Sequence, residues 1–147
     1  MKKRTSRGGF TLVELIIVMA IIGILAGVVL VNVGPQREKA NRTRAIADIK
    51  EMDSALEIYH ADSGVYPSAQ QGLQALFTQP NTPPVPRNWQ GPYIKNRTRP
   101  PLDPWGNEYL YLSPGEHNPT SFDLYSYGAD GRPGGTGKDA DVVPWEE

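Results

Sequence analysis

The chain has 147 residues, no cysteine and a net charge of −1, with 15 basic and 16 acidic residues. Four of the basic residues lie within the first nine, so residues 10–147 hold 11 basic and 16 acidic residues and carry a net charge of −5. This balance excludes a broad nucleic-acid-binding surface, the missing cysteines exclude disulfide bonds, and the length allows one small domain of roughly 110 residues besides a long apolar segment.

A short basic leader opens the chain. Residues 1–9 read MKKRTSRGG, and residues 10–33 form an apolar run interrupted only by Thr11, Glu14 and Asn32. As a helix rising about 1.5 Å per residue, this run is long enough to cross a hydrocarbon core of about 30 Å. A secretory signal would have a shorter apolar region with its small residues after it, whereas here two glycines precede it. We therefore expect residues 1–9 to be cleaved and residues 10–33 to remain as a transmembrane helix.

The residues around the expected cut resemble a known family. The run GFTLVE at residues 9–14, placed between a basic leader and an apolar helix, resembles the processing site of type IV pilins and type II secretion pseudopilins. The resemblance implies that a prepilin peptidase cuts after Gly9 and methylates the amine of Phe10. It also implies that Glu14 pairs with the Phe10 amine of a neighbouring subunit during assembly. The alternative is that Glu14 only reaches toward the lipid headgroups, because a carboxylate in hydrocarbon is costly.

The segment after Pro35 has the pattern of an amphipathic helix. Apolar residues recur at spacings of four and three, at Ala45, Ile49, Met52, Leu56 and Tyr59. This period predicts one long helix from about residue 11 to residue 63, whose outer half packs its apolar stripe on the domain core. Proline removes a helical hydrogen bond, so Pro35 marks a kink or a locally melted turn. Gly64 suits the C-terminal cap.

Two further segments follow the long helix. Ser68 and Gln71 have the spacing of a capping box, which predicts a short helix over about residues 69–77. Eight of the 14 prolines lie between residues 80 and 104, together with Trp89 and Tyr93. Because proline lacks a backbone donor, we expect an ordered irregular loop over residues 78–107.

The last part of the chain has the pattern of a small sheet. Tyrosine and leucine alternate after Glu108 and predict a strand over residues 108–113, and a second strand is expected over residues 122–127. A further short strand is expected near Val142 and Val143. Two neighbouring strands are marginal alone, so they should pack on the long helix.

Three carboxylates lie in a glycine-rich segment at residues 128–141. Asp130, Asp139 and Asp141 can bend round one hard cation, with backbone carbonyls completing the roughly six to eight oxygens that calcium takes. From the residues alone, a calcium site and a solvated Asp-Gly turn are equal alternatives. The run GVYPSAQQGLQALF at residues 64–77 resembles the corresponding stretch of the major pseudopilins, and this resemblance implies a C-terminal calcium loop with Asp130 as a ligand. The resemblance extends the ligand role to Asp139 and Asp141, although Lys138 places a positive charge beside them.

No catalytic set is visible in the sequence. His60 and His117 have no cysteine or second histidine at metal-ligand spacing. The glycine-rich segment lacks a phosphate-binding pattern. We therefore expect a protein that is not an enzyme.

These features, together with the resemblance, predict an α+β, type IV pilin-like fold, in which residues 10–33 form the filament core. The long N-terminal helix is expected to pack on a small antiparallel sheet. The resemblance implies that residues 34–147 form a periplasmic domain, with the sheet and calcium loop over residues 108–147. The resemblance covers residues 9–141 and identifies the chain as a member of the pseudopilins, in the manner of the major structural subunit. Basic residues on the two sides of the apolar run are equal in number, so the orientation with the domain in the periplasm rests on the resemblance.

The resemblance also implies a function and partners. The subunits would form a homo-oligomeric helical filament in the periplasm that promotes export of folded exoproteins through the outer membrane. The implied partners are minor pseudopilins, the prepilin peptidase, an inner-membrane assembly platform with its cytoplasmic ATPase, and an outer-membrane secretin, and the implied location is a single pass through the inner membrane. The alternatives are a type IV or competence-type pilin and, from another class, a membrane-anchored calcium-dependent binding module or enzyme.

Overall fold

The computed structural model describes residues 9–145, apart from the side chains of residues 28–35, and divides into two compact units. The first unit is Met1–Arg37 and the second is Glu38–Glu147. Of the predicted leader, only Gly9 lies within the described residues. Within the described part of the chain, no helical segment combines the length and apolarity that crossing a membrane requires.

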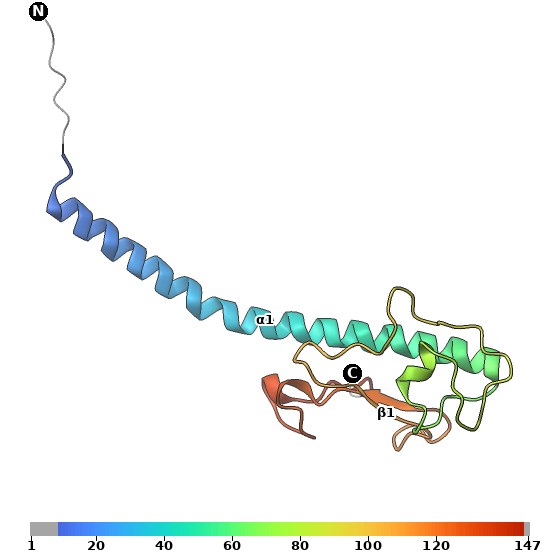
Figure 1. The fold of residues 1–147 in the computed structure, drawn as a ribbon. Coiled ribbons are helices and arrows are strands. Elements are labelled where there is room, and N and C mark those ends of the chain that lie inside the picture. The colour runs from blue at the N-terminus through green and yellow to red at the C-terminus, as the bar shows by residue number, and fades with distance from the viewer. Residues whose placement is uncertain (1–8, 146–147) are drawn as a thin grey trace, which may run out of the picture. The chain divides into compact units, whose positions relative to one another are not determined.

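The long helix α1 runs from Leu12 to Ser63 (Figure 1). The predicted helix over residues 11–63 is therefore confirmed to within one residue. The backbone is helical through Pro35, so the melted turn considered from the sequence does not occur in this described backbone. At the C-terminal end, Gly64 has a φ of 76°, and its N–H donates to the carbonyl of His60 at 2.7 Å. A left-handed glycine ends the helix as expected.

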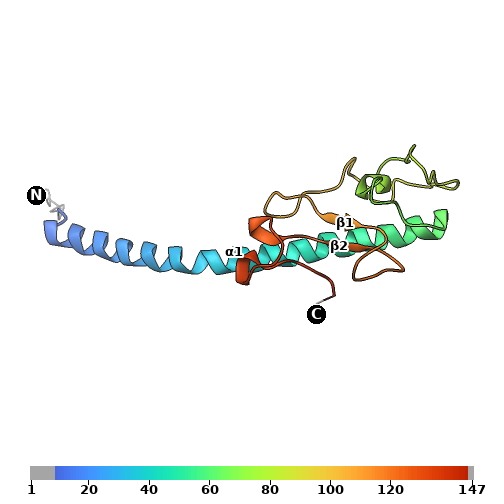
Figure 2. The ribbon, with the colours of Figure 1, turned by 90° about the horizontal axis from the view of Figure 1, so that it is seen from below.

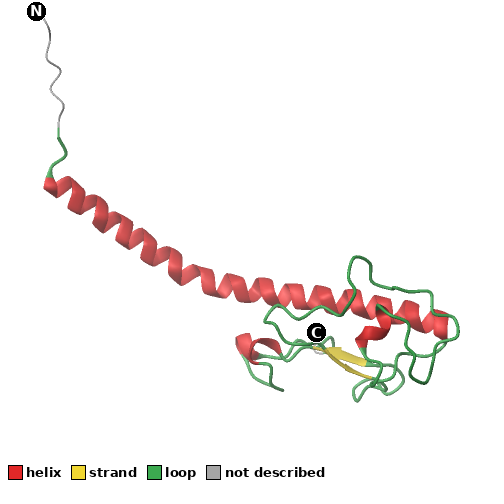
Figure 3. Cartoon of the chain, in the orientation of Figure 1, coloured by secondary structure: helices red, strands yellow, loops and turns green. Residues whose placement is uncertain are grey.

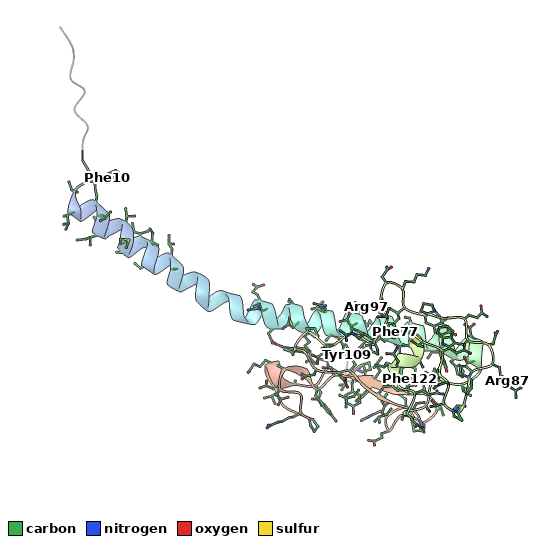
Figure 4. The ribbon with its side chains drawn as sticks, viewed as in Figure 1. Phe10, Phe77, Arg87, Arg97, Tyr109 and Phe122 are labelled. Carbon is green, nitrogen blue, oxygen red and sulfur yellow. The ribbon has the colours of Figure 1, made fainter. Side chains whose placement is uncertain are left out.

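The core of the second unit forms around the outer part of α1. All five residues of the predicted apolar stripe are at most 4% exposed: Ala45, Ile49, Met52, Leu56 and Tyr59. The residues packed in the same core come from the later segments, and they include Leu76, Phe77, Ile94, Tyr109, Phe122, Leu124 and Val142. Figure 4 labels Phe77, Tyr109 and Phe122 among the side chains of this unit. The stripe is thus core, as the helical period predicts.

The segment after α1 begins with a capping box but does not form the predicted α-helix. The amide of Ser68 donates to the side-chain oxygen of Gln71 at 3.0 Å, and the amide of Gln71 donates to the Ser68 hydroxyl at 3.3 Å. Turns follow, and then a 3₁₀ helix, η1, over Leu73–Leu76. The predicted helix over residues 69–77 was too long because Gly72, with a φ of 57°, breaks it. Glycine is the residue that adopts this conformation without steric cost.

An irregular loop follows η1, and side chains tie it to the core. The indole N–H of Trp89 donates to the carbonyl of Ala75 at 3.0 Å. The side-chain amide of Gln71 donates to the carbonyls of Thr82 and Pro84 at 2.6 and 3.0 Å. Figure 3 shows this part of the chain as loop. The predicted ordered irregular loop is confirmed.

The sheet consists of two short antiparallel strands, β1 at Leu110–Leu112 and β2 at Asp123–Tyr125, both labelled in Figure 2. Leu110 pairs with Tyr125, and Leu112 pairs with Asp123. Both strands are shorter than predicted. The strand expected near Val142 is a single isolated bridge to Ser126. Figures 1 and 2 show the strands beside the C-terminal part of α1, in agreement with the expected packing.

Candidate functional site

The first candidate site is the start of α1. The Thr11 amide and hydroxyl both donate to Glu14 Oε2, at 3.0 and 3.1 Å, and the Glu14 amide donates to the Thr11 hydroxyl at 3.2 Å. This is a reciprocal capping box, which satisfies free amides at a helix start. Glu14 was predicted to act in assembly, and the capping box is a second role, signalled in the sequence by threonine followed three residues later by glutamate.

The residues beside this cap are open to contact. Phe10 is 90% exposed and lies directly before the cap (Figure 4). The Thr11 and Glu14 side chains are also exposed, so Glu14 has free oxygen capacity beyond its bonds to Thr11. A carboxylate offers about four lone-pair sites, and the capping box uses only part of them. A partner's cation therefore has access to Glu14 without loss of the helix cap.

The described part of the first unit is an apolar helix without a covering layer of its own. Its large apolar side chains from Leu12 to Leu25 are all more than half exposed: Leu12, Val13, Leu15, Ile16, Ile17, Val18, Met19, Ile21, Ile22, Ile24 and Leu25. A contiguous exposed apolar surface of this kind marks a membrane or protein contact.

The second candidate site is the glycine-rich segment after β2. It contains two 3₁₀ helices, η2 at Gly128–Asp130 and η3 at Gly137–Asp139. Gly131 follows η2 in the left-handed conformation, with a φ of 64°. A side chain at Gly135 would collide with the backbone oxygen of Asp139, so glycine is required where these two backbone stretches approach. The sequence therefore folds the segment back on itself.

The three predicted ligands have different surroundings within this segment. Asp130 is exposed, and its Oδ1 accepts from the amide of Arg132 at 3.1 Å. Asp139 lies 3.6 Å from the ammonium nitrogen of Lys138. Asp141 Oδ2 accepts from the amide of Gly134 at 3.0 Å, while Asp141 Oδ1 is buried without a hydrogen-bond partner.

The chemistry of these side chains fits calcium, but their arrangement in the structure does not form a cluster around one point. Among the described residues, no three acidic or histidine side chains come close enough together to hold a metal ion. All three predicted ligands nevertheless offer oxygen, the donor that calcium takes. A buried carboxylate oxygen that no donor satisfies is costly, and a cation would relieve that cost. Of the three predicted ligands, Asp141 is the one with a buried carboxylate oxygen that has no hydrogen-bond partner.

A buried network holds the start of the glycine-rich segment. The Ser126 hydroxyl donates to Asp103 Oδ2 at 2.6 Å and accepts from the amide of Gly128 at 3.0 Å. The side-chain amide of Asn107 donates to the carbonyl of Gly128 at 3.0 Å. Asp103 Oδ1 also accepts from the amides of Trp105 and Asn107, so this carboxylate closes the turn at residues 103–107. The bond between Ser126 and Asp103 was not predicted from the sequence, because the two residues are 23 positions apart.

A second buried carboxylate stabilises the loop before β2. Burial raises the pKa of Asp123, but the hydrogen bonds from the backbone and side chains of His117 and Asn118 outweigh burial, and the net pKa is lowered. The His117 ring stacks on Trp145 with ring centres 4.2 Å apart. His117 therefore has a structural setting, and so does His60, which stacks on Tyr66.

Comparison with known proteins covers both candidate sites. Residues 32–145 match the family described as Type II secretion system (T2SS), protein G, and residues 4–30 match the prokaryotic N-terminal methylation motif. Proteins named type II secretion system core protein G from Vibrio cholerae and Pseudomonas aeruginosa are 47% and 46% identical to the chain. Their alignments cover 99% and 98% of this chain and 96% and 99% of those proteins.

A solved structure is also similar. The crystal structure of the major pseudopilin from the type 2 secretion system of enterohaemorrhagic Escherichia coli matches with a TM-score of 0.64 and 36% identity. The match covers 78% of this chain and 90% of that one. The α+β arrangement of a long N-terminal helix with a two-stranded antiparallel sheet is therefore a type IV pilin-like fold.

Proposed function

The chain belongs to the type II secretion system protein G family, and from this premise we propose that it is the major structural subunit of a pseudopilus. The subunits assemble into a helical filament in the periplasm, and the filament promotes export of folded exoproteins through the outer membrane. The match to protein G over residues 32–145 favours this function over a type IV or competence-type pilin. The role is structural, and we assign no catalytic residue.

The observation that carries this function is the exposed apolar surface of α1 between Leu12 and Leu25. Apolar surface of this extent is unfavourable in water, at roughly 25 cal/mol per Å². Lipid covers it before assembly, and the corresponding helices of neighbouring subunits cover it in the filament. The same residues therefore serve as an anchor and as the filament core.

The chain is associated with the cell envelope, as its methylation motif and its family imply. We propose a more specific placement, with one pass through the inner membrane and the second unit in the periplasm. The prepilin peptidase cuts after Gly9 and methylates Phe10. The minor pseudopilins, the assembly platform with its cytoplasmic ATPase, and the outer-membrane secretin are the proposed partners.

Glu14 has a role in assembly under this proposal. Its carboxylate pairs with the new Phe10 amine of an adjacent subunit and thereby sets the register of each helix that enters the filament. The support is geometric: Phe10 and Glu14 are both exposed, and the capping box with Thr11 fixes the position of the carboxylate. A glutamate at position 14 is therefore favoured for two separate physical reasons: it caps the helix, and it pairs with the neighbouring subunit.

The glycine-rich segment is the proposed calcium site. Asp130, Asp139 and Asp141 supply carboxylate oxygens, and the unpaired buried Oδ1 of Asp141 is the feature that supports a cation there. A bound calcium ion supplies positive charge that neutralises these carboxylates and orders the glycine-rich backbone. The chain has no cysteine, so a metal is the available cross-link for this segment.

The test is complementation of a type II secretion strain that lacks its own protein G. The wild-type chain should restore release of folded exoprotein, and Gly9→Val should leave uncleaved precursor and no release. Mass spectrometry of the membrane-purified wild type should show N-methylated Phe10 as the terminus. Gly27→Val is the matched control for cleavage, because it makes the same change within the apolar run and away from the cut, and it should be processed like the wild type. A functional chain that retains Met1 would contradict the proposal.

A further inference from the structure

A long-range contact joins α1 to the C-terminal segment. The guanidinium of Arg42 donates to the carbonyls of Ala140 and Asp141, at 3.3 and 3.0 Å, from two different terminal nitrogens. These partners are 98 and 99 residues away along the chain, and the Arg42 side chain is half-buried. Two consecutive carbonyls held by one planar fork cannot rotate independently, and a lysine cannot reproduce this geometry.

The residues held by Arg42 are fixed from the other side as well. Val142 is 1% exposed and exchanges two backbone hydrogen bonds with Ser126, at 3.1 and 2.8 Å. Asp141 therefore lies between the Arg42 contact and the Ser126 bridge. The Oδ2 atom of Asp141 accepts a hydrogen bond from the Gly134 amide, and its Oδ1 atom is buried without a hydrogen-bond partner. The backbone that carries this carboxylate is clamped on both sides.

We propose that Arg42 is a positioning residue for cation binding by the glycine-rich segment, an inference that rests on the proposed calcium site. Arg42 touches no carboxylate of the segment in the structure. It acts through the backbone at Ala140 and Asp141 and holds the Asp141 carboxylate in place before the cation arrives. Arg42 also connects the glycine-rich segment to α1. Ordering of the segment and packing of the segment on α1 are therefore coupled.

The backbone contact of Arg42 and its charge predict opposite changes in calcium affinity when Arg42 is replaced. If only the charge of Arg42 mattered, it would repel a divalent cation, and its removal would tighten calcium binding. If the clamp matters, removal frees at least one backbone residue that calcium must then order, which corresponds to roughly tenfold weaker binding. The two substitutions Arg42→Met and Arg42→Lys separate these effects, because lysine keeps the charge but not the fork.

The experiment uses the processed full-length chain in detergent micelles. Calcium chloride is titrated calorimetrically into wild type, Arg42→Met, Arg42→Lys and the control Lys39→Met, which removes an exposed cation from the same helix. A groove of about 230 Å³ beside Arg42, lined by residues including Ile46 and Val142, gives a methionine side chain room. Hydrogen exchange of residues 139–143 is measured in parallel without calcium.

We expect Arg42→Met to weaken calcium binding about tenfold and Arg42→Lys at least threefold, with Lys39→Met unchanged. Exchange at the Val142 amide should accelerate in both Arg42 variants only. Unchanged or tighter calcium binding in Arg42→Met would overturn the inference. If Arg42→Met fails to fold, unchanged or tighter calcium binding in Arg42→Lys would overturn the inference instead. If the wild type binds no calcium, the calcium proposal is wrong, and unchanged exchange at Val142 would then refute the clamp as well.

Discussion

Removal of the Ser126 hydroxyl should destabilise the second unit by about 3 kcal/mol. In Ser126→Ala, Asp103 loses the hydrogen bond at 2.6 Å, and the amide of Gly128 loses its acceptor at 3.0 Å. Asp103, Ser126 and Gly128 are all buried, so water does not replace either partner easily. A lost hydrogen bond to a charged group costs roughly 1.5–3 kcal/mol, and a buried unpaired amide costs roughly 1–3 kcal/mol. Asp103 keeps its bonds to Trp105 and Asn107, which favours the lower part of the combined range.

The measurement is urea unfolding of the processed chain in micelles, followed by tryptophan fluorescence. The control is Ser54→Ala, which removes an exposed hydroxyl that donates to the carbonyl of Lys50 at 2.9 Å. This control should change the free energy of unfolding by less than about 0.5 kcal/mol. A Ser126→Ala loss below about 1 kcal/mol would refute the argument that the Asp103–Ser126–Gly128 network holds the segment. Because Gly128 begins the proposed calcium loop, the same variant should also bind calcium more weakly.

Three further predictions concern assembly, metal and pH. Glu14→Ala should leave membrane insertion and processing intact but reduce sheared filaments relative to total subunit, and an undiminished filament yield would remove Glu14 from assembly. Chelation should lower the melting temperature of the wild type, by the equivalent of about 2.7 kcal/mol where calcium had been at a hundredfold excess over its Kd. Asp130→Ala should abolish that response, and equal melting curves with and without chelator would mean that the segment is only a solvated turn. The folded-state pKa of Asp123 is lowered, so its contribution to stability is complete above about pH 4 and is lost as the pH falls through the folded pKa. Asp123→Asn should therefore flatten the acid limb of the unfolding free energy, and an unchanged acid limb would contradict the assigned hydrogen bonds.

The features that sequence reasoning predicted well depend on local periodicity and motifs. The apolar spacing from Ala45 to Tyr59 determines which face of α1 is buried, because helix geometry alone places these side chains in one row. The Ser68–Gln71 box also formed as expected, since both partners lie within one turn. The α-helix expected after it failed at Gly72, where the backbone takes a conformation that an α-helix does not contain.

The features that sequence reasoning missed join residues that are far apart in the chain. Asp103 and Ser126 are 23 residues apart, and Arg42 and Asp141 are 99 apart. No pattern of spacing pairs such residues, because the fold rather than the sequence sets their separation. The same reason limits the calcium prediction: the three carboxylates are close in sequence, yet backbone turns direct them to different neighbours.

The two carbonyl acceptors of Gln71 have a practical consequence. The side-chain amide of Gln71 binds the backbone oxygens of Thr82 and Pro84. These two hydrogen bonds do not involve the side chains of the loop. Val85, which follows Pro84, is 50% exposed, and the natural chain contains no cysteine. A Val85→Cys substitution therefore introduces a unique thiol for a fluorophore, with which growth of single filaments can be followed without disturbing the core.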